Sequence, residues 1–329
     1  MAVQRENLEC TGQKQHTDVD WTNDHDRRVV AASLVQNVYN LEFDRQQPQF
    51  AQDRLRHFFN FELKRKLIDD EDSSIYGAIY EIKPTYPNHL PKYAPKYVIA
   101  FRGTILKSKR DMELDMKVFN DELHEDKPRF KHALEAVKQV VQEAWPANIW
   151  LAGHSLGSAI AMLVGKSMAQ EGKDLKAFLF NPTFVRYSPS KNIKNPGLKD
   201  GISFTKNDIK AGIYFAGGDQ QQELYNQFKA LSSWIPNLFV NQDDPICSGY
   251  IDHFRNRKIE AELSSISALQ AALGKDPHLP IYLLPKAYLT ISKNSSSRIY
   301  GIREAHELKQ WFATSSKVLI NDPIRVGEP

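Results

Sequence analysis

The chain has 329 residues, of which 41% are hydrophobic, and carries a formal net charge of +3. This length accommodates one large domain or two small ones and can bury a sizeable core, while the apolar content is ordinary for a globular protein. The nearly balanced charge gives no support for nucleic acid as a partner. The two cysteines, Cys10 and Cys247, are too few for a disulfide framework and fit a reducing compartment.

Residues 1–22 are mostly polar and charged, and we expect them to form a disordered tail before one domain over residues 23–329. The tail has no apolar segment of the kind that directs secretion. No stretch approaches the roughly 20 consecutive apolar residues that span a bilayer. We therefore expect a cytoplasmic protein with no stable insertion in a membrane.

The spacing of apolar residues predicts helices and strands in alternation along the domain. Helical spacing is found over residues 24–39, 50–67 and 130–144, and a run of good helix formers follows residue 155. Short, largely apolar runs predict strands over residues 75–82, 97–101, 149–152, 177–180 and 238–240, with further strand regions at 281–284 and 299–302. This alternation favours the α/β class, with a mostly parallel central sheet and helices on both faces.

Residues 181–233 differ in character from the rest of the domain. Lysine, asparagine and glycine dominate there, and apolar runs are few. This composition is typical of a cap inserted near the ends of the strands, although a solvent-exposed insertion without a function would have the same pattern.

The motif with the clearest chemistry is Gly-His-Ser-Leu-Gly at residues 153–157, which joins a predicted buried strand to a predicted helix. A serine between two glycines at such a turn is a nucleophile elbow. Gly153 and Gly157 lack a Cβ, so the turn can be sharp and the helix can pack close to the strand. Ser155 is then the candidate nucleophile, with its Oγ expected to be exposed at the sheet edge. The N–H of Leu156, at the helix N-terminus, is a candidate oxyanion donor.

A serine nucleophile needs a base, and the base needs a carboxylate to orient it. In α/β-hydrolases, which carry such an elbow, the order along the chain is serine, acid, histidine. Asp243 and Asp244 follow the predicted strand at residues 238–240, where a carboxylate on a loop would reach the elbow, and Pro245 would stiffen the turn. Spacing alone favours neither aspartate, and either could be an ordinary turn residue.

Three histidines follow these aspartates in the chain, namely His253, His278 and His306. His253 comes soon after Asp244 in a charged stretch, which is typical of an exposed helix position. His278 precedes the apolar run at residues 281–284 and is the alternative base. His306 follows a predicted strand end near the C-terminus, where sheets of this kind normally supply the base, and it is the favoured candidate.

The sequence predicts neither a cofactor nor a metal ion. It has no glycine-rich nucleotide-binding motif, no P-loop and no paired cysteine ligands. His306-Glu307 begins like the zinc-binding motif His-Glu-x-x-His, but Gln310 stands where the second histidine would be.

Five segments spread over the domain carry a further resemblance. They are residues 100–104 (Ala-Phe-Arg-Gly-Thr), 153–158, 180–182 (Phe-Asn-Pro), 239–247 and 304–306 (Glu-Ala-His). Residues 101–104 and the Gly-His-Ser-Leu-Gly motif, with the interval between them, resemble class 3 lipases, and all five segments more closely resemble a plant branch of lipase-like α/β-hydrolases often labelled GDSL esterases. The resemblance implies an α/β-hydrolase fold in which Thr104 contributes to the oxyanion hole, Asp244 is the acid and His306 is the base. Ser158 stands where the family commonly has a third glycine.

We therefore expect a serine carboxylic-ester hydrolase that forms an acyl-enzyme and acts on a small-molecule acyl ester or a lipid. Acyl transfer on the same scaffold and a non-catalytic lipase-like binding protein are alternatives, because fold alone does not decide between them. In secreted fungal lipases of this class the segment after the position of Thr104 is an apolar lid, whereas residues 107–117 here carry many charges of both signs. Such a strip is costly to desolvate, so dissolved or dispersed esters are expected as substrates rather than bulk triglyceride.

Overall fold

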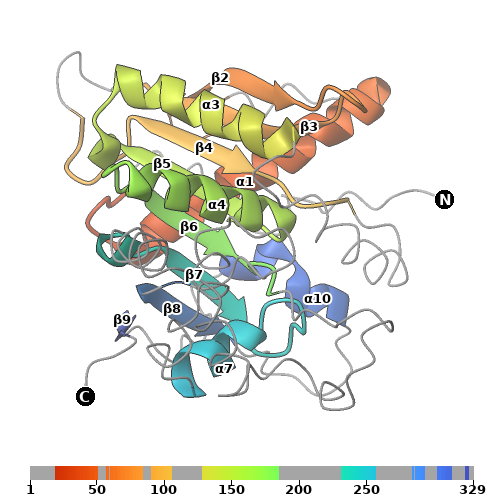
Figure 1. The fold of residues 1–329 in the computed structure, drawn as a ribbon. Helices are drawn as coiled ribbons and strands as arrows, with labels where there is room; N and C mark the ends of the chain where they lie inside the picture. The colour runs from red at the N-terminus through yellow and green to blue at the C-terminus, as the bar shows by residue number, and fades with distance from the viewer. Residues whose placement is uncertain are drawn as a thin grey trace, which may run out of the picture.

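In the part of the chain that the structure describes, nine strands form a single sheet in sequential order (Figure 1). The computed structural model describes residues 19–50, 57–58, 60–83, 90–105, 128–184, 231–256, 284, 286–292, 302–312 and 323–325. The strands are β1 (His57–Phe58), β2 (Phe61–Ile68), β3 (Ile75–Ile82), β4 (Tyr97–Phe101), β5 (Ile149–His154), β6 (Lys176–Phe180), β7 (Asn237–Asn241), β8 (Lys286–Ser292) and β9 (Pro323–Arg325). Neighbouring strands from β4 to β8 are parallel, and the pairs outside this block are antiparallel. The predicted parallel centre of the sheet is confirmed, with antiparallel strands added at both edges.

Helices cover both faces of this sheet. The α-helices are α1 (Asp24–Gln46), α3 (Pro128–Glu143), α4 (Leu156–Gln170), α7 (Gly249–Asn256) and α10 (Ile302–His306), and the 3-10 helices are η2 (Pro48–Phe50), η4 (Pro146–Asn148), η5 (Leu231–Ser233) and η6 (Leu308–Trp311). Helix α1 packs against β3, β4 and β5, whereas α4 packs against β4, β5 and β6 and alongside α3. Figure 1 shows α3 and α4 on the near side of the sheet and α1 behind it.

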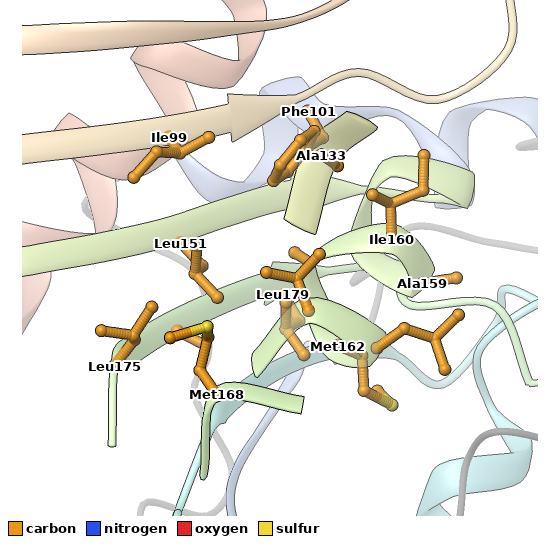
Figure 2. Packing of buried hydrophobic residues seen from close by; sticks show 14 of the residues in the cluster. Ile99, Phe101, Ala133, Leu151, Ala159, Ile160, Met162, Met168, Leu175 and Leu179 are labelled. Atoms are coloured by element: carbon orange, nitrogen blue, oxygen red, sulfur yellow. The ribbon is translucent and has the colours of Figure 1, made fainter. Parts of the chain in front are cut away.

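The two faces of the parallel strands bury separate cores, because side chains alternate along a strand. Ile99 and Leu151 belong to the core with α3 and α4, whereas Val98 and Trp150, one position earlier on the same strands, pack with the apolar residues of α1. Figure 2 shows Ile99, Leu151 and Leu179 together with side chains of α4. Strands buried on both faces are continuous apolar runs in the sequence, so their bounds could be predicted closely.

Most of the predicted elements agree with the structure. The helices expected over residues 24–39 and 130–144 are α1 and α3. The strands expected over residues 75–82 and 97–101 are β3 and β4 with the same bounds, and β5, β6 and β7 are each slightly longer than predicted.

The helix predicted over residues 50–67 is wrong, because strands β1 and β2 occupy His57–Phe58 and Phe61–Ile68. Leu63 and Leu67 are four residues apart, and this spacing fits one face of a helix and one face of a strand equally well. Pairing decides between the two: β2 is hydrogen-bonded to β3 along its length, and Leu67 is fully buried there.

The C-terminal strand prediction also needs correction. Ile302 begins α10 instead of ending a strand, and the strand that completes the parallel block is β8, which the sequence analysis missed. Alternate residues of β8 from Ala287 to Ile291 are buried, a period of two that the sequence pattern already contained. Residues 281–283 and 299–301 lie outside the described residues.

Folded structure begins before residue 23, where the sequence analysis placed the start of the domain. Trp21 is buried, and its ring meets those of Phe61 and Trp150 edge-on at centroid distances of 6.4 and 5.9 Å. Such aromatic pairs stabilise a core beyond the area that they bury. The folded domain therefore includes Trp21 as well as residues 23 and beyond.

Three predicted features fall outside the described residues: residues 1–18 of the tail, residues 185–230 of the cap and the charged strip at residues 107–117. Within the ranges that are described, no helix combines the length and the hydropathy needed to cross a membrane.

Replacing Trp21 by alanine should lower the free energy of unfolding by about 3 kcal/mol, because the loss of a buried tryptophan leaves a cavity in the core. Urea denaturation of the purified chain measures this change. Trp145→Ala is the matched control: Trp145 is 80% exposed, and its removal should change stability by less than about 0.5 kcal/mol. Equal effects of the two substitutions would contradict the placement of Trp21 in the core.

Candidate active site

Ser155 occupies the turn between β5 and α4 in the conformation that a nucleophile elbow requires. Its φ of 54° and ψ of −123° are a strained backbone conformation for a residue with a side chain. The N–H of Ser155 donates to the carbonyl of Phe180 at 3.0 Å, which ties the turn to β6. The residue as a whole is 6% exposed, and Gly103 packs against it: a Cβ on Gly103 would lie 2.8 Å from Ser155 Cβ.

Close packing around the elbow explains why both flanking residues are glycine. A Cβ on Gly153 would lie 2.6 Å from the N atom of Ser158, and a Cβ on Gly157 would lie 2.7 Å from the carbonyl oxygen of Arg102. Both neighbours are backbone atoms, which cannot move aside. Ser158, in the position of the family's third glycine, fits without a clash, and its Oγ lies 2.6 and 2.9 Å from the carbonyl oxygens of Gly153 and Phe180. Its hydroxyl therefore links α4 to the neighbouring strands.

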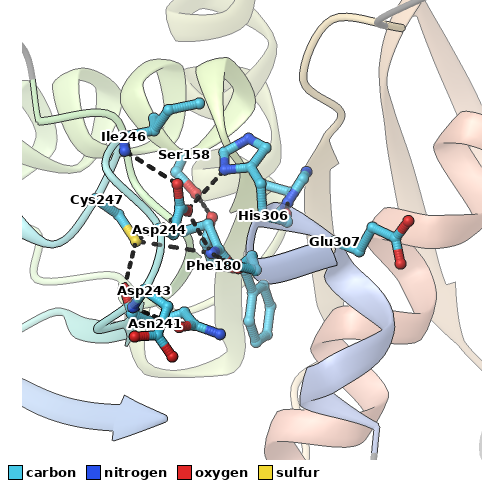
Figure 3. Close-up of polar contacts among 12 residues, drawn as sticks. Ser158, Phe180, Asn241, Asp243, Asp244, Ile246, Cys247, His306 and Glu307 are labelled. Atoms are coloured by element: carbon cyan, nitrogen blue, oxygen red, sulfur yellow. Dashed lines mark hydrogen bonds and ion pairs between the residues drawn. The ribbon is translucent and has the colours of Figure 1, made fainter. Parts of the chain in front are cut away.

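The structure brings together the acid and the base that the sequence analysis favoured. His306 Nδ1 lies 2.7 Å from Asp244 Oδ2 (Figure 3), and Asp244 is fully buried. Burial by itself raises the pKa of Asp244, but hydrogen bonds from His306, Asn181 and Cys247 outweigh this effect and hold the pKa below its usual value. Asp244 is therefore a carboxylate at neutral pH, and a carboxylate can only accept hydrogen bonds.

The pairing with Asp244 fixes the tautomer of His306. Because the carboxylate accepts, Nδ1 carries the proton and Nε2 presents a lone pair. His306 Nε2 is buried and has no hydrogen-bond partner among the described residues. The backbone carbonyl of His306 accepts a hydrogen bond from His154 Nε2 at 2.8 Å, which brings the base to the residue next to Ser155. Catalytic hydrogen bonds to a serine often tighten only when substrate is bound.

The other residues considered for the acid and the base do not join this pair in the described part of the chain. Asp243 is exposed, and its N–H donates to Asn241 Oδ1 at 2.8 Å, so it is the turn aspartate of this pair. His253 lies in α7, but its side chain is outside the described residues, as is all of His278. Within the described part of the chain, no group of three or more histidine, cysteine or acidic side chains could hold a metal ion.

Asn181 is a site residue whose role sequence reasoning missed. It follows β6 with a φ of 42°, and its Nδ2 donates to Asp244 Oδ2 at 2.7 Å and to the Ala305 carbonyl at 3.0 Å. Trp311 Nε1 donates to Asn181 Oδ1 at 2.6 Å, which fixes the orientation of the amide. Further donors to the carboxylate are the Cys247 thiol at 3.1 Å and the Ile246 N–H at 3.0 Å. The Phe-Asn-Pro segment marked Asn181, but its contacts join residues far apart in the sequence.

The two candidate oxyanion donors lie where β4 and β5 end. Leu156 is the first residue of α4, so its N–H belongs to the positive end of the helix dipole. Thr104 follows β4, and β4 pairs in parallel with β5, so both segments leave the sheet at the same edge. Arg102 Nη1 donates to the Gly103 carbonyl at 2.8 Å. A trans peptide points its C=O and N–H in opposite directions, so this bond also orients the N–H of Thr104.

His154, the second residue of the elbow motif, is buried beside this site. Its Nδ1 lies 2.8 Å from Tyr39 Oη and its Nε2 lies 2.8 Å from the His306 carbonyl oxygen. Burial, together with the nearby His306, lowers the pKa of His154 to about 3, so the ring is neutral at physiological pH. Sequence reasoning named neither His154 nor Tyr39 as a site residue, because the elbow motif leaves its second position open and this contact joins two distant segments.

The buried His154 should make the stability of the protein depend on pH. In the unfolded chain it takes up a proton near its ordinary pKa of 6.5, whereas the folded chain resists protonation down to about 3. The unfolded state therefore binds more protons in this window, and lowering the pH from 6.5 should destabilise the fold by up to about 1.4 kcal/mol per pH unit.

Urea unfolding between pH 7 and pH 4 tests this expectation, with His154→Gln as the comparison. The variant should lose this part of the pH dependence, and an unchanged slope would show that His154 takes up its proton equally well in the folded and the unfolded chain. The lowered pKa of Asp244 affects stability in a more acidic pH range. The stability that its charged form contributes is lost only as the pH falls below the ordinary pKa of 3.8.

Comparison with known proteins identifies the family. The family model described as Lipase (class 3) matches residues 98–188, which include all of β4 but its first residue, the elbow and β6. A GDSL esterase/lipase of Arabidopsis thaliana is 37% identical over 347 residues, covering 96% of this chain and 97% of that protein. Among solved structures, carboxyl esterase 2 of the fungus Tuber melanosporum is 15% identical with a TM-score of 0.32, over 74% of this chain and 93% of that one. The plant relative carries the assignment: the chain belongs to the class 3 lipase family of ester hydrolases, with an α/β-hydrolase fold.

Proposed function

We propose that this protein is a serine carboxylic-ester hydrolase that works through an acyl-enzyme intermediate. The observation that carries the proposal is the buried Asp244–His306 pair, which leaves His306 Nε2 as an unpartnered base among the described residues. The strained elbow at Ser155 supports it. The lipase family match and the esterase/lipase name of the plant relative support the same chemistry.

In the proposed mechanism Ser155 Oγ attacks the ester carbonyl while His306 Nε2 takes its proton. Asp244 holds the imidazole in the Nδ1–H tautomer and stabilises the imidazolium that forms. The N–H groups of Leu156 and Thr104 stabilise the oxyanion of the tetrahedral intermediate. His306 then gives the proton to the leaving alcohol, and water attacks the acyl-enzyme by the same steps to release the acid.

Replacing Ser155 by alanine should lower kcat for ester hydrolysis by about 10⁴- to 10⁶-fold, as the loss of a nucleophile does in serine proteases. A fluorophosphonate probe should label the wild-type chain and leave Ser155→Ala unlabelled. His306→Ala should be similarly inactive, with His278→Ala as the active control. If Ser155→Ala kept about a tenth of wild-type activity or more, the nucleophile would be misassigned, since triad variants lose far more. An inactive His278→Ala beside an active His306→Ala would move the base.

The substrate prediction rests on the charged strip at residues 107–117, which lies outside the described residues. Charges of both signs are costly to bury in lipid, and the strip offers no broad apolar face for a membrane surface. Activity should therefore rise smoothly with the concentration of short- to medium-chain acyl esters. A sharp increase in rate where the ester passes its solubility limit, or faster turnover of long-chain triglyceride emulsions, would contradict this argument.

A further inference from the structure

Three hydrogen bonds connect the oxyanion side of the site to the base. The N–H of Gly103 donates to Tyr39 Oη at 2.8 Å. Tyr39 Oη lies 2.8 Å from His154 Nδ1, and His154 Nε2 lies 2.8 Å from the carbonyl oxygen of His306. The chain of bonds thus runs from the end of β4, through α1 and β5, to the last residue of α10.

The donors and acceptors in this chain can be arranged in only one way. The carbonyl of His306 only accepts, so His154 must carry its proton on Nε2. Nδ1 of the neutral ring is then an acceptor, and Tyr39 donates its hydroxyl proton to it. The Tyr39 oxygen in turn accepts from the N–H of Gly103. A pKa of about 3 keeps His154 in this neutral form over the physiological pH range.

The Gly103 end of the chain bears directly on the candidate oxyanion hole. Gly103 is wedged against the elbow, since a Cβ there would lie 2.8 Å from both Ser155 Cβ and Tyr39 Oη. Tyr39 fixes its N–H, and Arg102 fixes its C=O. With both polar groups of Gly103 held, the peptide that carries the N–H of Thr104 cannot rotate.

The His306 end of the chain bears on the base. The rings of His154 and His306 are 5.0 Å apart between centroids, and His154 holds the backbone carbonyl of the same residue whose imidazole pairs with Asp244. A neutral neighbour does not oppose the positive charge that His306 gains during catalysis, whereas a protonated His154 at this distance would.

We propose that Tyr39 and His154 are positioning residues that hold the Thr104 oxyanion donor and the His306 base in register across the Ser155 elbow. The proposal rests on the proposed function, because it assigns a role within that active site. Neither residue touches the reacting atoms. Their effect is exerted through Gly103 and through the His306 backbone, and small misplacements of catalytic groups cost large factors in rate.

Tyr39→Phe tests the oxyanion end, because it removes the hydroxyl and keeps the ring. We expect kcat for a soluble ester to fall about 10- to 100-fold while KM changes less than about threefold, since the oxyanion exists only in the transition state and its intermediate. The rate of fluorophosphonate labelling of Ser155 should fall in parallel, because that reaction develops the same negative charge.

Tyr80→Phe is the matched control. The Tyr80 hydroxyl donates to Asn37 Oδ1 of α1 at 2.8 Å in a buried environment, so its removal also deletes one hydrogen bond between α1 and the sheet, outside this chain of bonds. Its kcat should stay within about twofold of wild type, as expected of a change remote from the site. Equal loss of kcat in the two variants, or wild-type kcat in Tyr39→Phe, would overturn the proposal. Assays are run well below the unfolding midpoint of each variant, so that unfolding does not lower kcat.

A pair of substitutions tests the base end. His154→Gln keeps an amide N–H that can reach the His306 carbonyl, whereas His154→Leu keeps only similar volume. The glutamine variant should have a kcat about tenfold higher than that of the leucine variant, and equal losses would overturn the role of this hydrogen bond.

Activity that survived Ser155→Ala would refute the proposed function and this proposal with it. Ser155-dependent activity that Tyr39→Phe and His154→Leu left intact would overturn the positioning roles alone.

Discussion

The close approach of α4 to the ends of β4 and β5 is the constraint on which the rest of the site depends. A Cβ at Gly153 would collide with the first turn of α4, and a Cβ at Gly157 would collide with backbone at the end of β4. In the proposed mechanism this contact lets the N-terminus of α4 and the segment after β4 face one substrate oxygen. The strained backbone of Ser155 costs roughly 1–3 kcal/mol, and it persists because the strand before it is packed in both cores and the helix after it is packed in the core with α3.

The buried carboxylate of Asp244 is the second constraint. An isolated carboxyl group in this position would become protonated and could no longer orient a histidine. His306, Asn181 and Cys247 all donate to its Oδ2 atom, and they come from three segments of the chain. The charge is stable only when these segments are assembled. The tautomer of the base is therefore a property of the whole fold, and not of the short turn that contains Asp244.

The structure or role of a residue could be predicted from the sequence where neighbouring residues determine it. It could not be predicted where contacts with distant parts of the chain determine it. Strands β3 and β4 were predicted with the correct bounds because both of their faces are buried. Strand β2 was mistaken for a helix because a spacing of four suits either structure, and its pairing with β3 decided the outcome. The elbow at Ser155 is a local motif. The role of Tyr39 could not be predicted, because its hydrogen-bond partner His154 lies 115 residues further along the chain.

The position of His306 shows how such distant contacts locate the proposed base. Helix α10 has five residues, too few to be stable alone, so its place depends on what holds it. The Ala305 carbonyl accepts from Asn181 at the end of β6, the next carbonyl accepts from His154 at the end of β5, and the imidazole binds Asp244 after β7. Three neighbouring strand ends thus fix the backbone and the ring of one residue. Each of these bonds ties α10 to a different strand, and Gln310 Nε2 of η6, which donates to the Ala305 carbonyl at 2.8 Å, adds a further restraint on the same segment.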